Sequence, residues 1–256
     1  MKTPNNYSHA LVRPPSSSFV NALAVSPVPI DVELARKQHA EYIAALRQAG
    51  VSVEILDADG RFPDSCFMQD PAMIVGGIAI LNRMGVPSRL GETDLVADLL
   101  RARFETLALT APATLEGGDV MNVGDSVLVG ESERTNRAGI EQLRALLEPR
   151  GVGVEAVAVR GMLHLLTDVT YVGHGIVVVW EEFADAPALR GFQKVIVPTE
   201  EAYAACTLGI GKYVIVPAGF PKTIEQLRVS GFEVLRVPMS EFYKADGGVS
   251  CLSLIW

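Results

Sequence analysis

The stretch Asp246-Gly247-Gly248-Val249-Ser250-Cys251 ends five residues before the last residue of the chain, and it completes a regular series along the sequence. The other members of the series, in order, are Asp70, Glu116, His164 and Cys206. Successive members are 46, 48, 42 and 45 residues apart. A period between roughly 20 and 50 residues is typical of repeat architectures. We therefore interpret each interval as one structural unit.

The residues within each interval predict roughly strand, strand, helix and strand. In the first interval, the apolar run Ala72–Leu81 predicts extended structure, and Glu92–Arg103 has its leucines at helical spacing. Further strands are predicted at Ser126–Gly130, Val154–Val159, Ile176–Trp180, Lys194–Val197, Tyr213–Val216 and Glu233–Val237, and further helices at Arg137–Leu147 and Thr223–Val229. This alternation indicates an α/β fold.

Five such units can close around a central axis, in the way that propeller blades do. One equivalent position from each unit would then point into the same central cavity. The alternative is that α/β units often have this length without any symmetry, and the sequence identity between the units is faint. We predict an α/β protein built as a five-bladed αβ propeller of pseudo-symmetric ββαβ repeats. No linker or block of charge divides residues 1–256, so we expect a single domain.

The composition is that of a compact globular protein. The chain has 256 residues, of which 49% are hydrophobic and 20% are charged. Its net charge of −8 argues against nucleic acid or an anionic membrane as a partner. No apolar run reaches the roughly 18–20 residues that span a bilayer, and the N-terminal residues lack the apolar stretch of a signal peptide. Three widely spaced cysteines do not form a disulfide framework. We expect a cytoplasmic protein, and a homodimer is plausible from general frequency.

Cys251 is the candidate nucleophile. A buried cysteine usually behaves as a small hydrophobic residue. The preceding Gly247-Gly248 favours reaction instead, because two glycines let the backbone crowd a ligand or adopt a positive φ. Cys66 and Cys206 lack this setting, and we expect both to be packed in the core.

His164 is the only polar side chain in the apolar run Met162–Leu166. It is either a hydrogen-bonded core residue or a general acid/base, and the presence of a candidate nucleophile favours the second interpretation. Glu116-Gly117-Gly118-Asp119 is either an ordinary turn with solvated acids or part of the same site. No set of histidine, cysteine and acidic residues has the spacing of zinc ligands, so we expect no metal.

Two acids and two arginines complete the candidate site. Asp64 and Asp70 flank a mainly apolar stretch, and Pro71 pushes Asp70 toward extended geometry. An acid between apolar strands needs a partner, which a bound cation would supply. Arg89 and Arg134 are either surface residues or receptors for a carboxylate.

Ten motifs follow one another along the chain from Arg61 to Cys251: Arg61-Phe62-Pro63-Asp64-Ser65, Asp70-Pro71, Ser88-Arg89, Gly91-Glu92-Thr93, Glu116-Gly117-Gly118-Asp119, Gly130-Glu131-Ser132, Arg134-Thr135-Asn136, Leu163-His164-Leu165, Pro217-Ala218-Gly219 and the stretch Asp246–Cys251. In this order they resemble the dimethylarginine dimethylaminohydrolases, a family of guanidino-group-modifying enzymes. The resemblance implies a five-bladed αβ propeller with the active site on its axis, and residues 1–256 as a single catalytic domain. It also implies hydrolysis of Nω-methylated arginine to citrulline and a methylamine, without metal or organic cofactor.

The resemblance also implies a role for each candidate residue. Cys251 is the nucleophile, His164 the general acid/base and Glu116 the carboxylate that orients it. The substrate-binding residues it implies are Leu23 in a lid, Asp64 in support of the site, Asp70 on the guanidinium, and Arg89 and Arg134 on the α-carboxylate.

Three positions depart from the family pattern. Gln69 stands where glutamate is usual, Leu90 replaces a second arginine, and Ala245 replaces a larger aliphatic residue. We count Gln69 among the substrate-binding residues, since it removes a negative charge beside the guanidinium or changes the contact to the α-amino end. It therefore also supports the main alternative, a related hydrolase of another small guanidine or ureido compound resembling arginine deiminase. A non-catalytic propeller that binds a protein partner is a further alternative, and it has no need for these four residue types in register.

Overall fold

The repeating unit of the fold is a three-stranded sheet with one crossover. The computed structural model describes residues 5–159 and 163–256. In the first complete unit, β3 (Ala72–Val75) pairs antiparallel with β4 (Ile78–Leu81). The chain then crosses through α2 (Asp94–Arg101) to β5 (Thr106–Ala108), which pairs parallel with β4. The order strand, strand, helix, strand matches the order that the sequence predicts.

The next three units repeat this topology, with one antiparallel and one parallel pairing each. Their elements are β6 (Val120–Asn122), β7 (Ser126–Glu131), α3 (Arg137–Leu147) and β8 (Gly153–Ala158); β9 (Val169–Gly173), β10 (Ile176–Trp180) and β11 (Gln193–Val197); and β12 (Leu208–Ile210), β13 (Tyr213–Pro217), α5 (Pro221–Val229) and β14 (Glu233–Val237). In the unit of β9–β11, residues 181–192 form the short 3₁₀ turns η5 (Glu181–Phe183) and η6 (Pro187–Leu189) where the other units have an α-helix.

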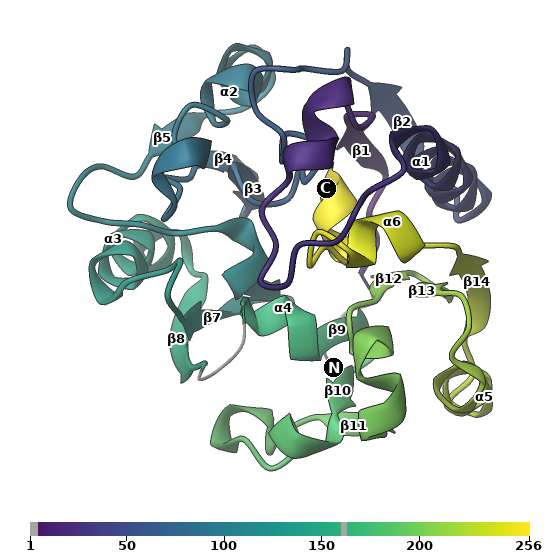
Figure 1. Ribbon diagram of the computed structural model, residues 1–256. Coiled ribbons are helices and arrows are strands. Elements are labelled where there is room, and N and C mark those ends of the chain that lie inside the picture. The colour runs from purple at the N-terminus through teal and green to yellow at the C-terminus, as the bar shows by residue number, and fades with distance from the viewer. Residues whose placement is uncertain (1–4, 160–162) are drawn as a thin grey trace.

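The fifth unit joins the two ends of the chain. The C-terminal strand β15 (Ser253–Ile255) pairs antiparallel with β1 (His9–Val12), and β1 continues through α1 (Val32–Gln48) to β2 (Ser52–Ile55). The five sheets thus close into a ring around a central axis (Figure 1). The predicted five-bladed arrangement of ββαβ units is confirmed.

The hydrophobic core lies between neighbouring sheets. The middle strand of each sheet is buried on both faces, so alternate side chains enter different clusters. In β7, Leu128 packs in one cluster, while Val127 and Val129 pack in the next. In β10, Val178 likewise packs in one cluster, while Val177 and Val179 pack in another. Five such clusters of described residues link each sheet to the next, and full burial of one of these side chains contributes roughly 1.5–3 kcal/mol.

Two predicted elements differ in detail from the structure. The apolar run Ala72–Leu81 is not one strand but the hairpin β3–β4, turned at Gly76 and Gly77, whose φ values are 61° and 81°. The run is apolar throughout because both strands are almost entirely buried. The helix expected over Glu92–Arg103 is shorter, because Glu92 is used in an ion pair ahead of α2.

The regular series of residues has a structural basis. Each member lies a few residues before the first strand of a sheet: Asp70 before β3, Glu116 before β6, His164 before β9, Cys206 before β12 and Cys251 before β15. These first strands pack against one another: β9 contacts both β6 and β12, and β15 contacts β3. The equivalent positions therefore converge around the axis of the ring. Among the described helices, none has the length and apolar character needed to cross a bilayer.

Candidate active site

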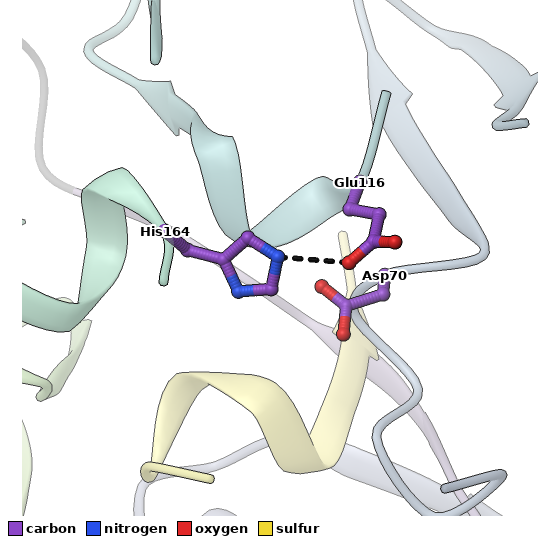
Figure 2. Close-up of side chains that lie close together, drawn as sticks. All are labelled: Asp70, Glu116 and His164. Atoms are coloured by element: carbon purple, nitrogen blue, oxygen red, sulfur yellow. Dashed lines mark hydrogen bonds and ion pairs between the residues drawn. The ribbon is translucent and has the colours of Figure 1, made fainter. Parts of the chain in front are cut away.

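His164 and Glu116 form a buried pair near the axis. Nε2 of His164 lies 2.9 Å from Oε2 of Glu116 (Figure 2), and the glutamate is fully buried. Oε1 of Glu116 accepts a hydrogen bond from the backbone N–H of Gly85 at 2.9 Å, and Arg134 Nη1 donates to Oε2 at 3.3 Å. Because these donors fix the carboxylate, the carboxylate in turn fixes the orientation of the imidazole ring.

The turn Glu116–Asp119 contacts the same histidine and the residue that follows it. A Cβ atom on Gly118 would lie 2.7 Å from Nδ1 of His164, so only glycine lets the ring approach this closely. Oδ1 of Asp119 accepts the N–H of Leu165 at 2.9 Å and thereby holds the residue after the histidine. Both acids are fully buried, which excludes an ordinary turn with solvated acids.

Asp70 is a buried carboxylate beside this pair. Its Oδ1 accepts from the backbone N–H of Gly118 at 2.9 Å, and its Oδ2 from Arg89 Nη1 at 2.9 Å. Burial raises the pKa of Asp70, but the charges of His164 and Arg89 lower it by more, so the pKa lies below its ordinary value. Asp70 is therefore ionised at neutral pH.

The electrostatics of His164 follow from the acids around it. Burial lowers the pKa of the imidazole, whereas Asp70, Glu116 and Asp119 together raise it by more. The pKa of His164 thus lies above its ordinary value, which favours the protonated ring. A protonated imidazole is able to act as a general acid.

The candidate nucleophile Cys251 lines the same small cavity as Asp70 and His164. Gly248 N–H lies 3.4 Å from its Sγ. The interaction with the Cys206 thiol, burial and the charge of Asp70 raise the pKa of Cys251 well above its ordinary value. In the protein alone, Cys251 is therefore held as a thiol, and a cation in the cavity would favour the thiolate.

The role of the two glycines before Cys251 differs from the expected one. A Cβ on Gly247 would lie 2.3 Å from the ring of Phe67, and one on Gly248 would lie 2.1 Å from Cys206 Sγ. The positive φ in this segment belongs to Asp246, at 53°. The glycines are thus needed because neighbouring side chains press on the backbone. Cys206 is buried as expected, and it also contacts the segment that carries the nucleophile.

Most of the predicted site residues line one small cavity, of about 30 Å³. They are Leu23, Asp64, Asp70, Arg89, Arg134, His164 and Cys251, together with Phe67, Leu163, Ala245 and Asp246. Glu116 does not line this cavity; it contacts His164, which does. Gln69 does not line this cavity; its side chain belongs to a different one, with Asn5 and Tyr7, and its Oε1 accepts no hydrogen bond from residues 5–159 or 163–256. An influence of Gln69 on substrate choice stays a prediction.

A segment of chain between the 3₁₀ turn η1 (Ser17–Asn21) and α1 passes over the centre of the ring (Figure 1). Its backbone is held by two carboxylates of the cavity. Leu23 N–H donates to Asp64 Oδ1 at 3.1 Å, and Val25 N–H donates to Asp246 Oδ2 at 2.6 Å. Leu23 therefore lies at the edge of the cavity, in the segment that passes over it.

Arg89 contacts more acids than the sequence indicates. Its Nε and Nη2 donate to both oxygens of Glu92, at 3.0 and 2.8 Å, while Nη1 holds Asp70. Glu92 is 2% exposed and was not among the predicted site residues. The sequence did carry a signal for Glu92: it belongs to the motif Gly91-Glu92-Thr93 and lies three residues after Arg89. Asp119 and Asp246 were also missed as supporting residues, although both belong to quoted motifs.

The side chains of Asp70, Glu116 and His164 are also close enough to act as metal ligands. Their ligand atoms lie within 4.8 Å of one another. However, Arg89 Nη1 lies 2.9 Å from Asp70 Oδ2 and 3.8 Å from Glu116 Oε2, so a cation of the protein already serves both carboxylates.

Comparisons with known proteins agree with this geometry. The family model described as "N,N dimethylarginine dimethylhydrolase, eukaryotic" matches residues 17–196. The N(G),N(G)-dimethylarginine dimethylaminohydrolase of Pseudomonas aeruginosa is 38% identical over 251 residues, covering 97% of this chain and 99% of the relative.

Two solved structures are similar to this chain over almost its whole length. One is the enzyme of Pseudomonas aeruginosa, as a cysteine-to-serine variant complexed with citrulline; it has a TM-score of 0.96 and 37% identity, and covers 98% of this chain and 100% of its own. The other is a histidine-to-glycine variant of a dimethylarginine dimethylaminohydrolase as an adduct with S-methyl-L-thiocitrulline, with a TM-score of 0.95, 38% identity and the same coverage. The chain described here belongs to the dimethylarginine dimethylaminohydrolase family.

Proposed function

We propose that the protein hydrolyses Nω-methylated arginine to citrulline and a methylamine through a covalent intermediate on Cys251. One observation carries this proposal: the thiol of Cys251, the imidazole of His164 and the carboxylate of Asp70 line the same cavity. The names of the relatives support it. So do the citrulline complex and the S-methyl-L-thiocitrulline adduct of the two similar structures, which hold a citrulline and a citrulline analogue.

In this proposal the substrate guanidinium is held by Asp70 and Glu116. A carboxylate has about four lone-pair positions, so Asp70 retains acceptor capacity beside Gly118 and Arg89. The α-carboxylate is received by Arg134, whose guanidinium makes one ion pair with the described part of the chain, to Glu116. Arg89 also binds the α-carboxylate, through its two N–H groups that are not directed at Glu92 or Asp70. Leu23 and Asp64 close the cavity above the substrate.

The reaction begins with loss of the Cys251 proton. The substrate cation beside the sulfur lowers the thiol pKa, and the proton leaves to solvent. The sulfur then bonds to the guanidinium carbon, which gives a tetrahedral adduct. His164 donates its proton to the substituted nitrogen, the C–N bond breaks, and the methylamine departs from an S-alkylthiouronium intermediate.

The second half of the reaction regenerates the enzyme. Neutral His164, still oriented by Glu116, takes a proton from water as the oxygen attacks the same carbon. The C–S bond breaks and the remaining hydroxyl proton is lost as the ureido group of citrulline forms. That proton replaces the one that Cys251 released at the start, so the thiol is restored. Each proton taken up or released by His164 is thereby balanced within one turnover.

The test is steady-state formation of citrulline from asymmetric dimethylarginine, monomethylarginine and arginine, with Cys251→Ser as the control. We expect citrulline from both methylated substrates, little from arginine and none with the variant. A Cys251-dependent preference for arginine would instead assign the protein as a deiminase. A folded wild-type protein without activity on any of the three would overturn the proposal.

A further inference from the structure

A second and larger cavity lies on the other side of the reacting groups. Its volume is about 270 Å³, against about 30 Å³ for the cavity that holds the arginine-binding residues. The two cavities share Leu163, His164, Asp246 and Cys251 as lining residues. A substrate bound in the smaller cavity would therefore direct the substituent on its far guanidine nitrogen into the larger one.

The wall of this cavity is aromatic, and it is assembled from three parts of the ring. Trp180 ends β10, Tyr203 lies in the turn before β12, and Tyr243 ends α6 (Ser240–Tyr243). The ring centroids of Tyr203 and Tyr243 are 4.3 Å apart. The Tyr203 hydroxyl donates to Gly247 O at 2.7 Å, and Trp180 Nε1 donates to Thr199 at 3.3 Å. Because protein groups already serve these two polar atoms, the two side chains offer a ligand their ring surfaces.

Asp168 adds to the same cavity a carboxylate that has no counter-ion among residues 5–159 and 163–256. It lies four residues after His164, its side chain is 6% exposed, and it lines the cavity. Its Oδ2 is buried and accepts no hydrogen bond from any described residue, and no described cation pairs with it. Burial, with a contribution from Glu182, raises its pKa to about 6, so it is mostly ionised at pH 7. A buried carboxylate without a partner is costly, and such a site is stabilised by a bound cation.

The proposed reaction releases a product with this chemistry. The departing amine is neutral when the C–N bond breaks, and an alkylamine then takes up a proton in water at neutral pH. An alkylammonium ion binds well to aromatic faces beside a carboxylate. The cavity is also larger than a dimethylamino group needs: three heavy atoms at roughly 30 Å³ each, the share of one liquid water, occupy roughly 90 Å³.

Resting on the proposed function, we propose that this second cavity binds the N-substituent of the guanidine and then the alkylammonium product, with Asp168 as the counter-ion. The substrate class is accordingly that of Nω-alkylated arginines whose substituent exceeds two methyl groups and carries a positive charge at its end.

The test compares two substrates of equal size, Nω-(3-aminopropyl)arginine and the neutral Nω-butylarginine, with asymmetric dimethylarginine as the reference. We expect wild type to hydrolyse both larger substrates and to prefer the aminopropyl compound about tenfold in kcat/KM. In Asp168→Asn this preference falls to about one. The matched control is Asp98→Asn, at an exposed acid far from the cavity, which keeps the tenfold preference.

A second variant and a binding measurement keep the proposal independent of any folding defect at Asp168. Tyr243 is 59% exposed, so Tyr243→Leu is tolerated and should raise KM severalfold for both larger substrates. Calorimetric titration of Cys251→Ser with 1,3-diaminopropane should show binding that Asp168→Asn, added to it, abolishes. Hydrolysis of dimethylarginine without hydrolysis of either larger substrate, or a preference that survives Asp168→Asn, would overturn this inference alone. Absence of hydrolysis of dimethylarginine would overturn the proposed function instead.

Discussion

Oε2 of Glu116 lies 2.9 Å from Nε2 of His164, within a group of carboxylates that raises the pKa of the imidazole despite its burial. This relationship favours the protonated form of His164, and it determines how the proposed reaction should respond to pH and to substitution.

Replacing Glu116 by glutamine should lower both the rate and the pH at which activity is lost. The amide keeps the size of the side chain but removes a negative charge from the histidine. The pKa of His164 then falls, and the basic limb of the pH profile of kcat moves to lower pH. We expect kcat to fall by about 10²-fold, the lower end of what a positioned general acid contributes. Glu131→Gln, at an exposed acid, is the control, and an unchanged basic limb in Glu116→Gln would contradict the assignment.

The same shift links His164 to stability. Its pKa in the folded protein lies above the unfolded value of about 6.5. The stabilisation from protonating His164 is therefore fully present below about pH 6.5 and is lost as the pH rises through the folded pKa. Urea unfolding of wild type and His164→Asn should show a difference in unfolding free energy that is larger at pH 6 than at pH 9.5. A difference that grows with pH would show that the shift has the opposite sign.

Two arginine–acid pairs offer a direct comparison of buried and exposed ion pairs. Both are spaced i,i+3: Arg89 with Glu92, at 2.8 Å and almost fully buried, and Arg101 with Asp98, at 2.9 Å and exposed. Glu92→Ala should lower the unfolding free energy by about 3–5 kcal/mol, since it leaves part of a buried guanidinium unpaired. Asp98→Ala should cost about 0–1 kcal/mol. Equal effects in chemical denaturation would contradict the burial argument. Glu92→Ala should also raise KM, because Arg89 loses the partner that positions it.

The thiols of Cys206 and Cys251 should titrate as a unit. The pKa of Cys206 is lowered to about 7, and the interaction with Cys251 is the largest cause. The third thiol, Cys66, does not ionise in this range, because burial raises its pKa well above its ordinary value. Ultraviolet absorbance of thiolate should therefore rise near pH 7 in wild type. The step should disappear in Cys251→Ala, because the remaining buried thiol has lost the partner that lowers its pKa most and keeps only the weaker interaction with Ser250. Persistence of the step in that variant would assign it to another group.

The sequence predicts the ring because its regular spacing has a geometric cause. A residue placed just before the first strand of each sheet recurs whenever the unit recurs, and Asp70, Glu116, His164 and Cys251 need that place to reach the axis. Composition could not separate the hairpin β3–β4 from a single strand, because two strands buried on both faces are apolar throughout. Nor could it show that the unit after His164 uses 3₁₀ turns in its crossover.

What the sequence could not predict depends on contacts between distant units. Gln69 is adjacent to Asp70 along the chain, yet its side chain lies in another cavity, because the turn ahead of β3 directs the two side chains apart. The aromatic cavity is assembled from Trp180, Tyr203 and Tyr243, which share no motif. Only the folded ring brings them beside His164. A homodimer and a cytoplasmic location stay predictions from composition and general frequency.

Pairing of β15 with β1 has a consequence for how the protein comes into being on the ribosome. Domains fold from the N-terminal side as the chain emerges, but β1, which can pair early with β2, must wait for its other partner more than two hundred residues later in the sequence. That partner strand also brings Cys251 to the axis, so the thiol takes its place only when the ring closes. Contacts of such long sequence separation slow folding. A nascent chain that still lacks β15 should therefore have no complete active site. Catalytic activity should appear only when β15 pairs with β1.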